Sequence, residues 1–182
     1  MERFGDIAGK RVILRAAYGQ DWGVLLTLSG DPGIGKVTKG YQRSAVSAYR
    51  MGASCFRPVP ADSFRRIIAD QEDPDTGLGV IMLSDMDAEN GTAQIYIKLL
   101  EPARGRGYGQ DAVDALVTYA FRELGLKCIC SSILEDNTAS RKLFEACGFR
   151  LEGIHEGRAD RKGRCRKVCT YVRNYNLKEN TI

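Results

Sequence analysis

The chain has 182 residues, a length typical of a single domain with enough residues to bury a sizeable core. Its 27 basic and 23 acidic side chains leave a net charge of +4, which is too mild to favour nucleic acid as the main partner. No segment approaches about 18 uninterrupted apolar residues, and the N-terminus lacks a secretory pattern. We therefore expect one soluble, cytoplasmic domain over residues 1–182 that does not contact a membrane.

The first half of the chain alternates strand-like segments with turns. Residues 18–60 are its least regular part and include a loop at 30–35 and a helical pattern at 41–51. Apolar side chains in β-rich runs predict strands at residues 10–16, 64–69, 78–83 and 93–100. A turn around Pro74 and another at residues 89–91 should connect the last three of these strands. No repeat or low-complexity tract interrupts this order.

The segment after these strands combines three glycines with two arginines. Its sequence is Arg104-Gly105-Arg106-Gly107-Tyr108-Gly109, and Pro102 just before it blocks continuation of a central strand. Beyond it, apolar residues recur as on one face of an α-helix, and Gly125 is placed to end that helix. The recurring residues are Val113, Leu116, Val117, Ala120, Phe121 and Leu124. A strand therefore ends before the glycines, and a helix begins at them.

The start of this helix is suited to binding a phosphate group. The first N–H groups of a helix have no partner within the helix and lie at the positive end of its dipole. Glycines lack a Cβ atom, so phosphate oxygens can approach those donors closely, and Arg104 and Arg106 add positive charge. The alternative is a glycine-rich turn that binds no ligand. Other phosphate loops fit less well, because Gly-x-x-x-x-Gly-Lys-Ser/Thr is absent and the glycine spacing differs from a dinucleotide fingerprint.

A second strand and helix follow the first. Residues 128–134 are strand-like, Asp136 or Asn137 can cap a helix, and Gly148 can end it. One face of the expected helix carries Ala139, Leu143 and Cys147. The last two strands are expected at residues 150–156 and 168–175, paired across a turn.

Both helix starts resemble the signatures of one enzyme family, the GNAT N-acetyltransferases. The glycine-rich segment resembles the acetyl-CoA signature Gln/Arg-x-x-Gly-x-Gly/Ala, with its defined positions filled by Arg104, Gly107 and Gly109. Residues 131–149 look like the second signature of that family. The resemblance covers about residues 10–176 by element order and 93–153 by specific motif. Within the family, the chain looks most like the branch of ribosomal-protein N-terminal and spermidine or diamine acetyltransferases.

The resemblance implies an α/β (α+β) fold. The family's sheet is central, twisted, mixed and mostly antiparallel, with about six to seven strands flanked by about four helices. Acetyl-CoA is the implied co-substrate, and the implied acceptor is a primary amine on a protein N-terminus, a polyamine or another small molecule. A homodimer is one assembly that we expect. The implied cofactor contacts lie at Leu99, Leu100, Arg104, Gly105, Arg106, Gly107, Tyr108, Gly109, Gln110, Asn137 and Ser140.

Acetyl transfer to an amine requires a base for the amine proton, and an acid can protonate the CoA thiolate. Many related enzymes use a tyrosine as that acid where this chain has Phe144, so Ser140 is the nearest substitute. The alternative for Ser140 is an ordinary helix serine. Gln94 stands where related strands often carry a glutamate, so a carboxylate near a strand end would have to relay the proton through water, and Glu156 is the candidate base. Other carboxylates near strand ends are Asp85, Asp87 and Asp160.

Two other functions stay open at this point. The replacements at Gln94 and Phe144 would also fit a catalytically weak acyl-CoA-binding module, and the basic cluster at 158–167 would suit nucleic acid or a ribosomal surface. We expect no metal, because His155 is the only histidine and Cys165 and Cys169 lack a Cys-x-x-Cys partner pair. Cysteines 128, 130 and 147 fall in core-like positions and are expected as reduced thiols.

Overall fold

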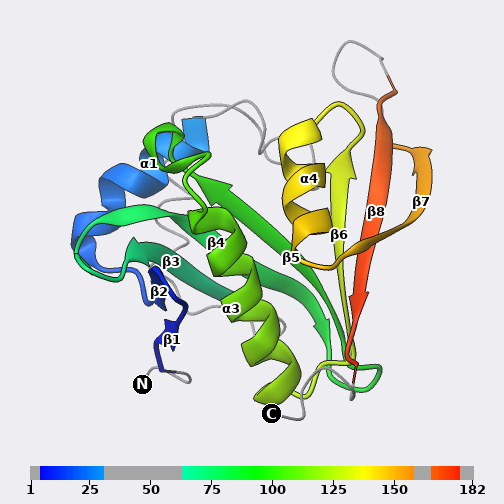
Figure 1. The fold of residues 1–182 in the computed structure, drawn as a ribbon, viewed down its shortest axis with the longest axis horizontal. Helices are drawn as coiled ribbons and strands as arrows, with labels where there is room; N and C mark the ends of the chain where they lie inside the picture. Colours follow the sequence, from blue (N-terminus) through cyan, green and yellow to red (C-terminus); the bar gives the residue numbers. More distant parts are fainter. Residues whose placement is uncertain (1–4, 31–62, 158–164, 177–182) are drawn as a thin grey trace.

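The computed structural model describes residues 5–30, 63–157 and 165–176. These residues form one eight-stranded sheet in the order β1-β2-β3-β4-β5-β6-β8-β7 (Figure 1). Neighbouring strands are antiparallel except β5 and β6, which are parallel. The strands span Ile7–Ala8 (β1), Val12–Arg15 (β2), Phe64–Asp70 (β3), Gly77–Asp87 (β4), Thr92–Leu99 (β5), Cys128–Leu134 (β6), Arg150–Glu156 (β7) and Lys167–Asn174 (β8). The expected mixed, mostly antiparallel sheet is confirmed.

Within these described ranges, the α-helices are α1 (Trp22–Gly30), α3 (Tyr108–Arg122) and α4 (Thr138–Ala146). Helix α3 contacts β1, β2 and β5, α4 contacts α3, and α1 contacts β4. None of these helices is long and apolar enough to cross a membrane. The helical pattern at 41–51 lies outside the described residues. The described part thus holds three of the roughly four helices that we expected.

The predicted strands lie within one or two residues of their expected bounds, apart from one additional strand and one extension. Strand β1 is an additional two-residue strand, with Ile7 opposite Leu14 of β2, and it brings the sheet to eight strands. Two residues are too few to show a periodic pattern, so the sequence could not predict it. Strand β4 reaches Asp87 instead of ending near residue 83, and its register with β5 shifts between Ser84 and Asp87. The polar residues of that extension end the apolar alternation before the strand ends.

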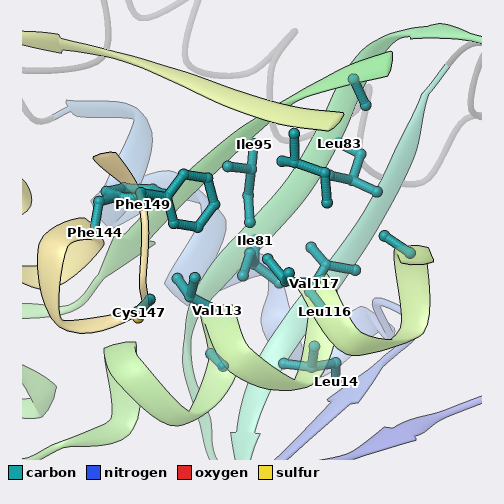
Figure 2. Packing of buried hydrophobic residues seen from close by; sticks show 14 of the residues in the cluster. Leu14, Ile81, Leu83, Ile95, Val113, Leu116, Val117, Phe144, Cys147 and Phe149 are labelled. Atoms are coloured by element: carbon teal, nitrogen blue, oxygen red, sulfur yellow. The ribbon is translucent and has the colours of Figure 1, made fainter. Parts of the chain in front are cut away.

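The main hydrophobic core lies between α3, α4 and the sheet. Figure 2 shows side chains of α3 beside those of β2, β4 and β5, with the two phenylalanines of the α4 region at one end. Phe144 and Phe149 meet edge to face, with ring centroids 5.0 Å apart. Fully buried members include Leu14, Ile81, Leu83, Ile95, Val113, Leu116 and Val117. Each such side chain contributes about 1.5–3 kcal/mol of burial free energy, so this core fixes α3 on the sheet.

A smaller cluster lies on the opposite face of the sheet. Leu25 of α1 packs with Ile67 and Ala69, whereas Ile68 between them belongs to the main core. Successive strand residues point to opposite faces, so α1 and α3 cover the two sides of β3.

The C-terminal end of α3 is closed by Gly125, whose φ is 69°. This confirms the predicted helix stop.

A buried ion pair connects α1 to the sheet. The Arg15 guanidinium donates two hydrogen bonds to the Asp21 carboxylate, at 2.7 and 2.9 Å, and the two side chains are 3% and 1% exposed. Arg15 Nε donates to the Pro74 carbonyl at 2.6 Å, and the Tyr18 N–H donates to Asp21 at 2.7 Å. The hydrogen bonds to Asp21 raise the pKa of Arg15 above its ordinary value. Arg15 of β2 therefore joins the segment before α1, through Asp21, to the turn between β3 and β4, through Pro74.

We expect Asp21→Asn to lower the free energy of unfolding by about 3 kcal/mol, because it leaves the buried Arg15 charge without its counterion. Urea unfolding followed by circular dichroism measures this change. Glu89→Gln, in the exposed turn between β4 and β5, is the control and should change stability by less than about 0.5 kcal/mol. Equal midpoints for Asp21→Asn and the parent protein would show that the pair contributes little to stability.

Candidate active site

The parallel strands β5 and β6 separate after three residue pairs. Residues 92–94 lie opposite residues 128–130, and the buried Ser131 hydroxyl then donates to the Ile95 carbonyl at 3.2 Å. No later residues of these two fully described strands pair with each other, although β5 runs on to Leu99. Each strand keeps its other neighbour, β4 or β8. Figure 1 shows the two strands diverging toward their carboxyl ends, which leaves one edge of each without a strand partner.

The glycine-rich segment forms the entry to α3, as the sequence predicts. Gly105 and Gly107 have φ values of 71° and 85°, in the left-handed region that glycine adopts without strain. The Asp111 N–H donates to the Gly107 carbonyl at 3.2 Å. The N–H groups of residues 108–110 precede this bond and have no partner within the helix. A Cβ atom on Gly105 would meet nothing within 4 Å, so there is open space around this position.

The predicted cofactor residues differ in what they can still offer a ligand. Tyr108 is buried, and its hydroxyl donates to Asp70 at 2.7 Å, which lowers the pKa of Asp70 and raises that of Tyr108. The N–H of Leu100 is used by β4, to which it donates at 2.9 Å. Arg104 Nε donates to the Leu99 carbonyl at 3.1 Å. Tyr108 can therefore contribute its backbone N–H to a ligand, but not its hydroxyl-bearing ring.

The turn between β1 and β2 holds the start of α3 in place. The Asp111 carboxylate accepts hydrogen bonds from the N–H groups of Lys10, Arg11 and Val12, at 2.9, 2.7 and 3.0 Å. Gly9 lies against the same carboxylate, and a Cβ atom there would be 2.6 Å from an Asp111 oxygen. No local sequence pattern predicts this clamp between Asp111 and the β1–β2 turn. An acidic residue in the first turn of a helix was the available signal, but its partners are 99 to 101 positions away.

The start of α4 brings two predicted residues together. Asn137 caps the helix, because its side-chain oxygen accepts a hydrogen bond from the Ser140 N–H at 3.2 Å. The cap confirms one of the two roles predicted for Asn137, and it leaves the amide nitrogen of this exposed side chain as a donor. Ser140 is half-buried. Phe144, one turn further on, is buried in the core, so its ring has a packing role.

Polar side chains gather on the face of β5 that points away from α3. The Tyr96 hydroxyl donates to the Gln94 side-chain oxygen at 2.6 Å, and both residues alternate with the buried Ile95 of the main core. Burial raises the pKa of Tyr96, and the negative charge of Asp85 adds to that increase. Asp85 lies at the irregular end of β4 with a φ of 51°, and its carboxylate accepts from the Ser84 hydroxyl at 3.1 Å. A carboxylate, a hydroxyl and an amide thus lie near one another on this face.

The predicted base is located at the edge of the sheet. Glu156 is an exposed residue at the end of β7, opposite Lys167 of β8. Strand β8 lies between β7 and β6, so the Glu156 backbone is about 10 Å from β6 at the usual strand spacing. His155, its neighbour, is exposed as well. The geometry therefore does not bring Glu156 next to Tyr96 on β5.

The sulfur chemistry of the described residues is that of reduced thiols. Cys128, Cys130, Cys147, Cys165 and Cys169 are all free, which agrees with the sequence prediction for the first three. Burial raises the pKa of Cys147 to about 12, so this thiol remains protonated at neutral pH.

Within residues 5–30, 63–157 and 165–176, no group of three or more metal-binding side chains occurs. Most of the basic cluster at 158–167 lies outside these ranges.

Comparison with known proteins matches residues 11–150 to the acetyltransferase (GNAT) domain family. The chain is 30% identical over 92 residues to the "SPbeta prophage-derived uncharacterized N-acetyltransferase YokL" of Bacillus subtilis (strain 168), covering 50% of this chain and 51% of that protein. It is 32% identical over 108 residues to the "Putative ribosomal N-acetyltransferase YdaF" of the same strain, covering 56% and 59%. The chain thus spans about half the length of the curated relatives that it matches.

Among solved structures, the fold is similar to that of spermidine N-acetyltransferase from Vibrio cholerae in complex with CoA and spermine. The TM-score is 0.73 and the identity 19%, over 90% of this chain and 95% of that one. At this identity the likeness concerns the fold. The family match over residues 11–150 includes β5, β6, α3 and α4, which border the divergence of the two strands. The chain therefore belongs to the acetyltransferase (GNAT) domain family.

Proposed function

We propose that the protein is an acetyl-CoA-dependent N-acetyltransferase that moves an acetyl group to a primary amine. The observation that carries this proposal is the divergence of β5 and β6 next to the glycine-rich start of α3. Two unpaired strand edges offer backbone donors and acceptors to a ligand between them, and the helix start offers donors to its phosphates. Named N-acetyltransferases among the relatives and a CoA-bound structure with the same fold support this assignment.

The residues at the start of α3 fit the pyrophosphate of acetyl-CoA. The N–H groups of residues 108–110 have no helical partner, and glycines at 105, 107 and 109 keep Cβ atoms away from them. Arg104 and Arg106 contribute positive charge. The acyl end would then lie between β5 and β6, beside Leu99 and Leu100 and near Asn137 and Ser140 at the start of α4. We retain all of these residues as cofactor contacts.

The chemistry is a direct transfer between two bound substrates. The amine nitrogen attacks the thioester carbonyl carbon, the C–S bond breaks, and CoA leaves as a thiolate. One proton must leave the amine, and one can be added to the sulfur. Holding both substrates in position supplies much of the acceleration, and backbone N–H groups can polarise the carbonyl. Ser140, half-buried at the start of α4, is the proposed hydrogen-bond donor to the departing sulfur.

The acceptor amine is proposed to enter from the face of β5 that carries Tyr96 and Gln94. The charge of Asp85 on this face would attract an ammonium group before it loses its proton. Glu156 remains a candidate for the base, but it would need a water molecule to reach the amine from the sheet edge. A polyamine, a protein N-terminus and a small amine all carry the required group. Relatives named for spermidine and for ribosomal acetylation make the first two the classes to test first.

A thiol-release assay with acetyl-CoA and a panel of amines tests the function. Polyamines, N-terminal peptides and aminoglycosides form the panel, and mass spectrometry identifies the acetylated product. We expect at least one amine to yield equal amounts of free CoA and acetylamine. If the protein bound acetyl-CoA but acetylated no amine, it would instead be the acyl-CoA-binding module that the replacements at Gln94 and Phe144 also fit.

We expect Gly107→Glu to weaken acetyl-CoA binding at least about tenfold, equivalent to about 1.4 kcal/mol. The substitution places a carboxylate where phosphate is proposed to bind. Calorimetric titration measures the change. Gly107→Gln is the matched control, because it adds the same Cβ atom at a φ of 85° without the charge. If the glutamate variant bound acetyl-CoA as well as the parent protein does, the pyrophosphate would not lie at this position. An equal loss in both variants would trace the loss to the added side chain and not to its charge.

We expect Ser140→Ala to lower kcat more than it raises the KM for acetyl-CoA. A hydrogen bond to the sulfur strengthens as negative charge develops there, so its loss affects the transition state most. The helix should persist, because the cap uses the Ser140 backbone N–H, which alanine retains. Steady-state kinetics with the best amine of the panel measures both constants. A raised KM with unchanged kcat would reduce Ser140 to a ground-state contact.

A further inference from the structure

Arg11 lies in the turn before β2, far from the glycine-rich loop in sequence but next to it in space. Its Nη1 atom donates to the Arg106 carbonyl at 2.6 Å, across 95 positions of the chain. The same atom lies 3.0 Å from the place that a Cβ atom would take on Gly107. The guanidinium carbon lies 4.9 Å from the centroid of the Tyr108 ring. A hydrogen bond and a cation–π contact thus hold this positive charge at the entry to α3.

The backbone of Arg11 is also held in place by a hydrogen bond. Its N–H donates to the Asp111 carboxylate at 2.7 Å, and the neighbouring N–H groups of Lys10 and Val12 donate to the same carboxylate. Three backbone donors occupy the Asp111 oxygens. The second carboxylate nearby, Asp70, accepts the Tyr108 hydroxyl. Both carboxylates are therefore engaged by other donors.

Within residues 5–30, 63–157 and 165–176 the Arg11 guanidinium forms no direct ion pair. The carboxylate on which its charge acts is Asp70, whose pKa it helps to lower. A second guanidinium, that of Arg106, lies 5.7 Å from the centroid of the same Tyr108 ring. Both guanidiniums act on the single Asp70 carboxylate, so a net positive charge remains at the entry to α3 and attracts a further anion. A guanidinium has five N–H donors, and the bond to Arg106 uses one of them. The remaining donors suit the planar, two-pronged recognition of a phosphate.

We propose that Arg11 is a phosphate ligand of CoA, supplied to the start of α3 by the turn between β1 and β2. The inference rests on the proposed function, in which CoA is the phosphate-bearing molecule at this helix start. It adds a cofactor contact from outside both family signatures. CoA carries a pyrophosphate and a 3′-phosphate, and both offer the chemistry that a guanidinium binds.

Arg11→Met tests the proposal, because it removes the charge and keeps an apolar side chain that can pack on Tyr108. Arg122→Met is the matched control, since this arginine lies at the other end of α3, about 20 Å away along the helix. Both variants and the parent are titrated calorimetrically with CoA and 3′-dephospho-CoA. Pantetheine, which has no phosphate, is titrated at millimolar concentration and followed by protein NMR. We expect Arg11→Met to weaken CoA binding at least about tenfold and Arg122→Met to change it less than about twofold.

The three ligands locate the contact. If Arg11→Met binds CoA more weakly than the parent protein does but binds 3′-dephospho-CoA equally well, Arg11 contacts the 3′-phosphate. If its affinity is reduced for both of these ligands but not for pantetheine, Arg11 contacts the pyrophosphate. Unchanged CoA affinity in Arg11→Met would overturn the proposal. An equal loss for all three ligands would overturn it too, because Arg11 would then only shape the loop. A parent protein that binds CoA no better than pantetheine would contradict the cofactor site itself and so the proposed function.

Discussion

The limited pairing of β5 with β6 is the constraint on which the rest of the structure depends. After residues 94 and 130 the two strands share no further ladder, so their facing edges carry N–H and C=O groups without strand partners. The Ser131 hydroxyl and Arg104 Nε satisfy the carbonyls of Ile95 and Leu99, and groups without such a side-chain partner need water or a ligand. The sheet tolerates the separation because β4 and β8 still pair with the outer edges. The opening therefore lies in the middle of the sheet, where the neighbouring strands keep both of its sides fixed.

The connections that follow the two strands place both helix starts at the opening. Helix α3 begins at Tyr108 after β5 ends at Leu99, and α4 begins at Thr138 after β6 ends at Leu134. Because these connections are short, each helix starts close to the carboxyl end of its strand. The positive ends of two helix dipoles thus lie near the same gap. An anionic cofactor fits this arrangement better than a neutral one.

The sequence predicted the elements that depend on local signals and missed those that depend on distant contacts. Gly125 and Asn137 mark helix ends through backbone conformation and capping, which are readable within a few residues. The clamp between Asp111 and the β1–β2 turn joins positions about 100 residues apart, and no local pattern records it. Glu156 was chosen as a carboxylate near the end of a predicted strand, and only the strand order shows that this strand lies at the sheet edge.

Close packing at the clamp also makes the residue that fits at position 9 depend on the residue at position 111. A side chain at position 9 would bring its Cβ atom within 2.6 Å of an Asp111 oxygen, a distance that real Cβ atoms do not adopt. A Cβ atom at position 9 would therefore displace the Asp111 carboxylate from its hydrogen bonds, so aspartate at 111 favours glycine at 9, although the chain has no positive φ there. A lineage that replaces the aspartate with a smaller residue releases this restriction. Substitutions at 9 and 111 should then appear together in homologous sequences, as a covarying pair in two separate segments.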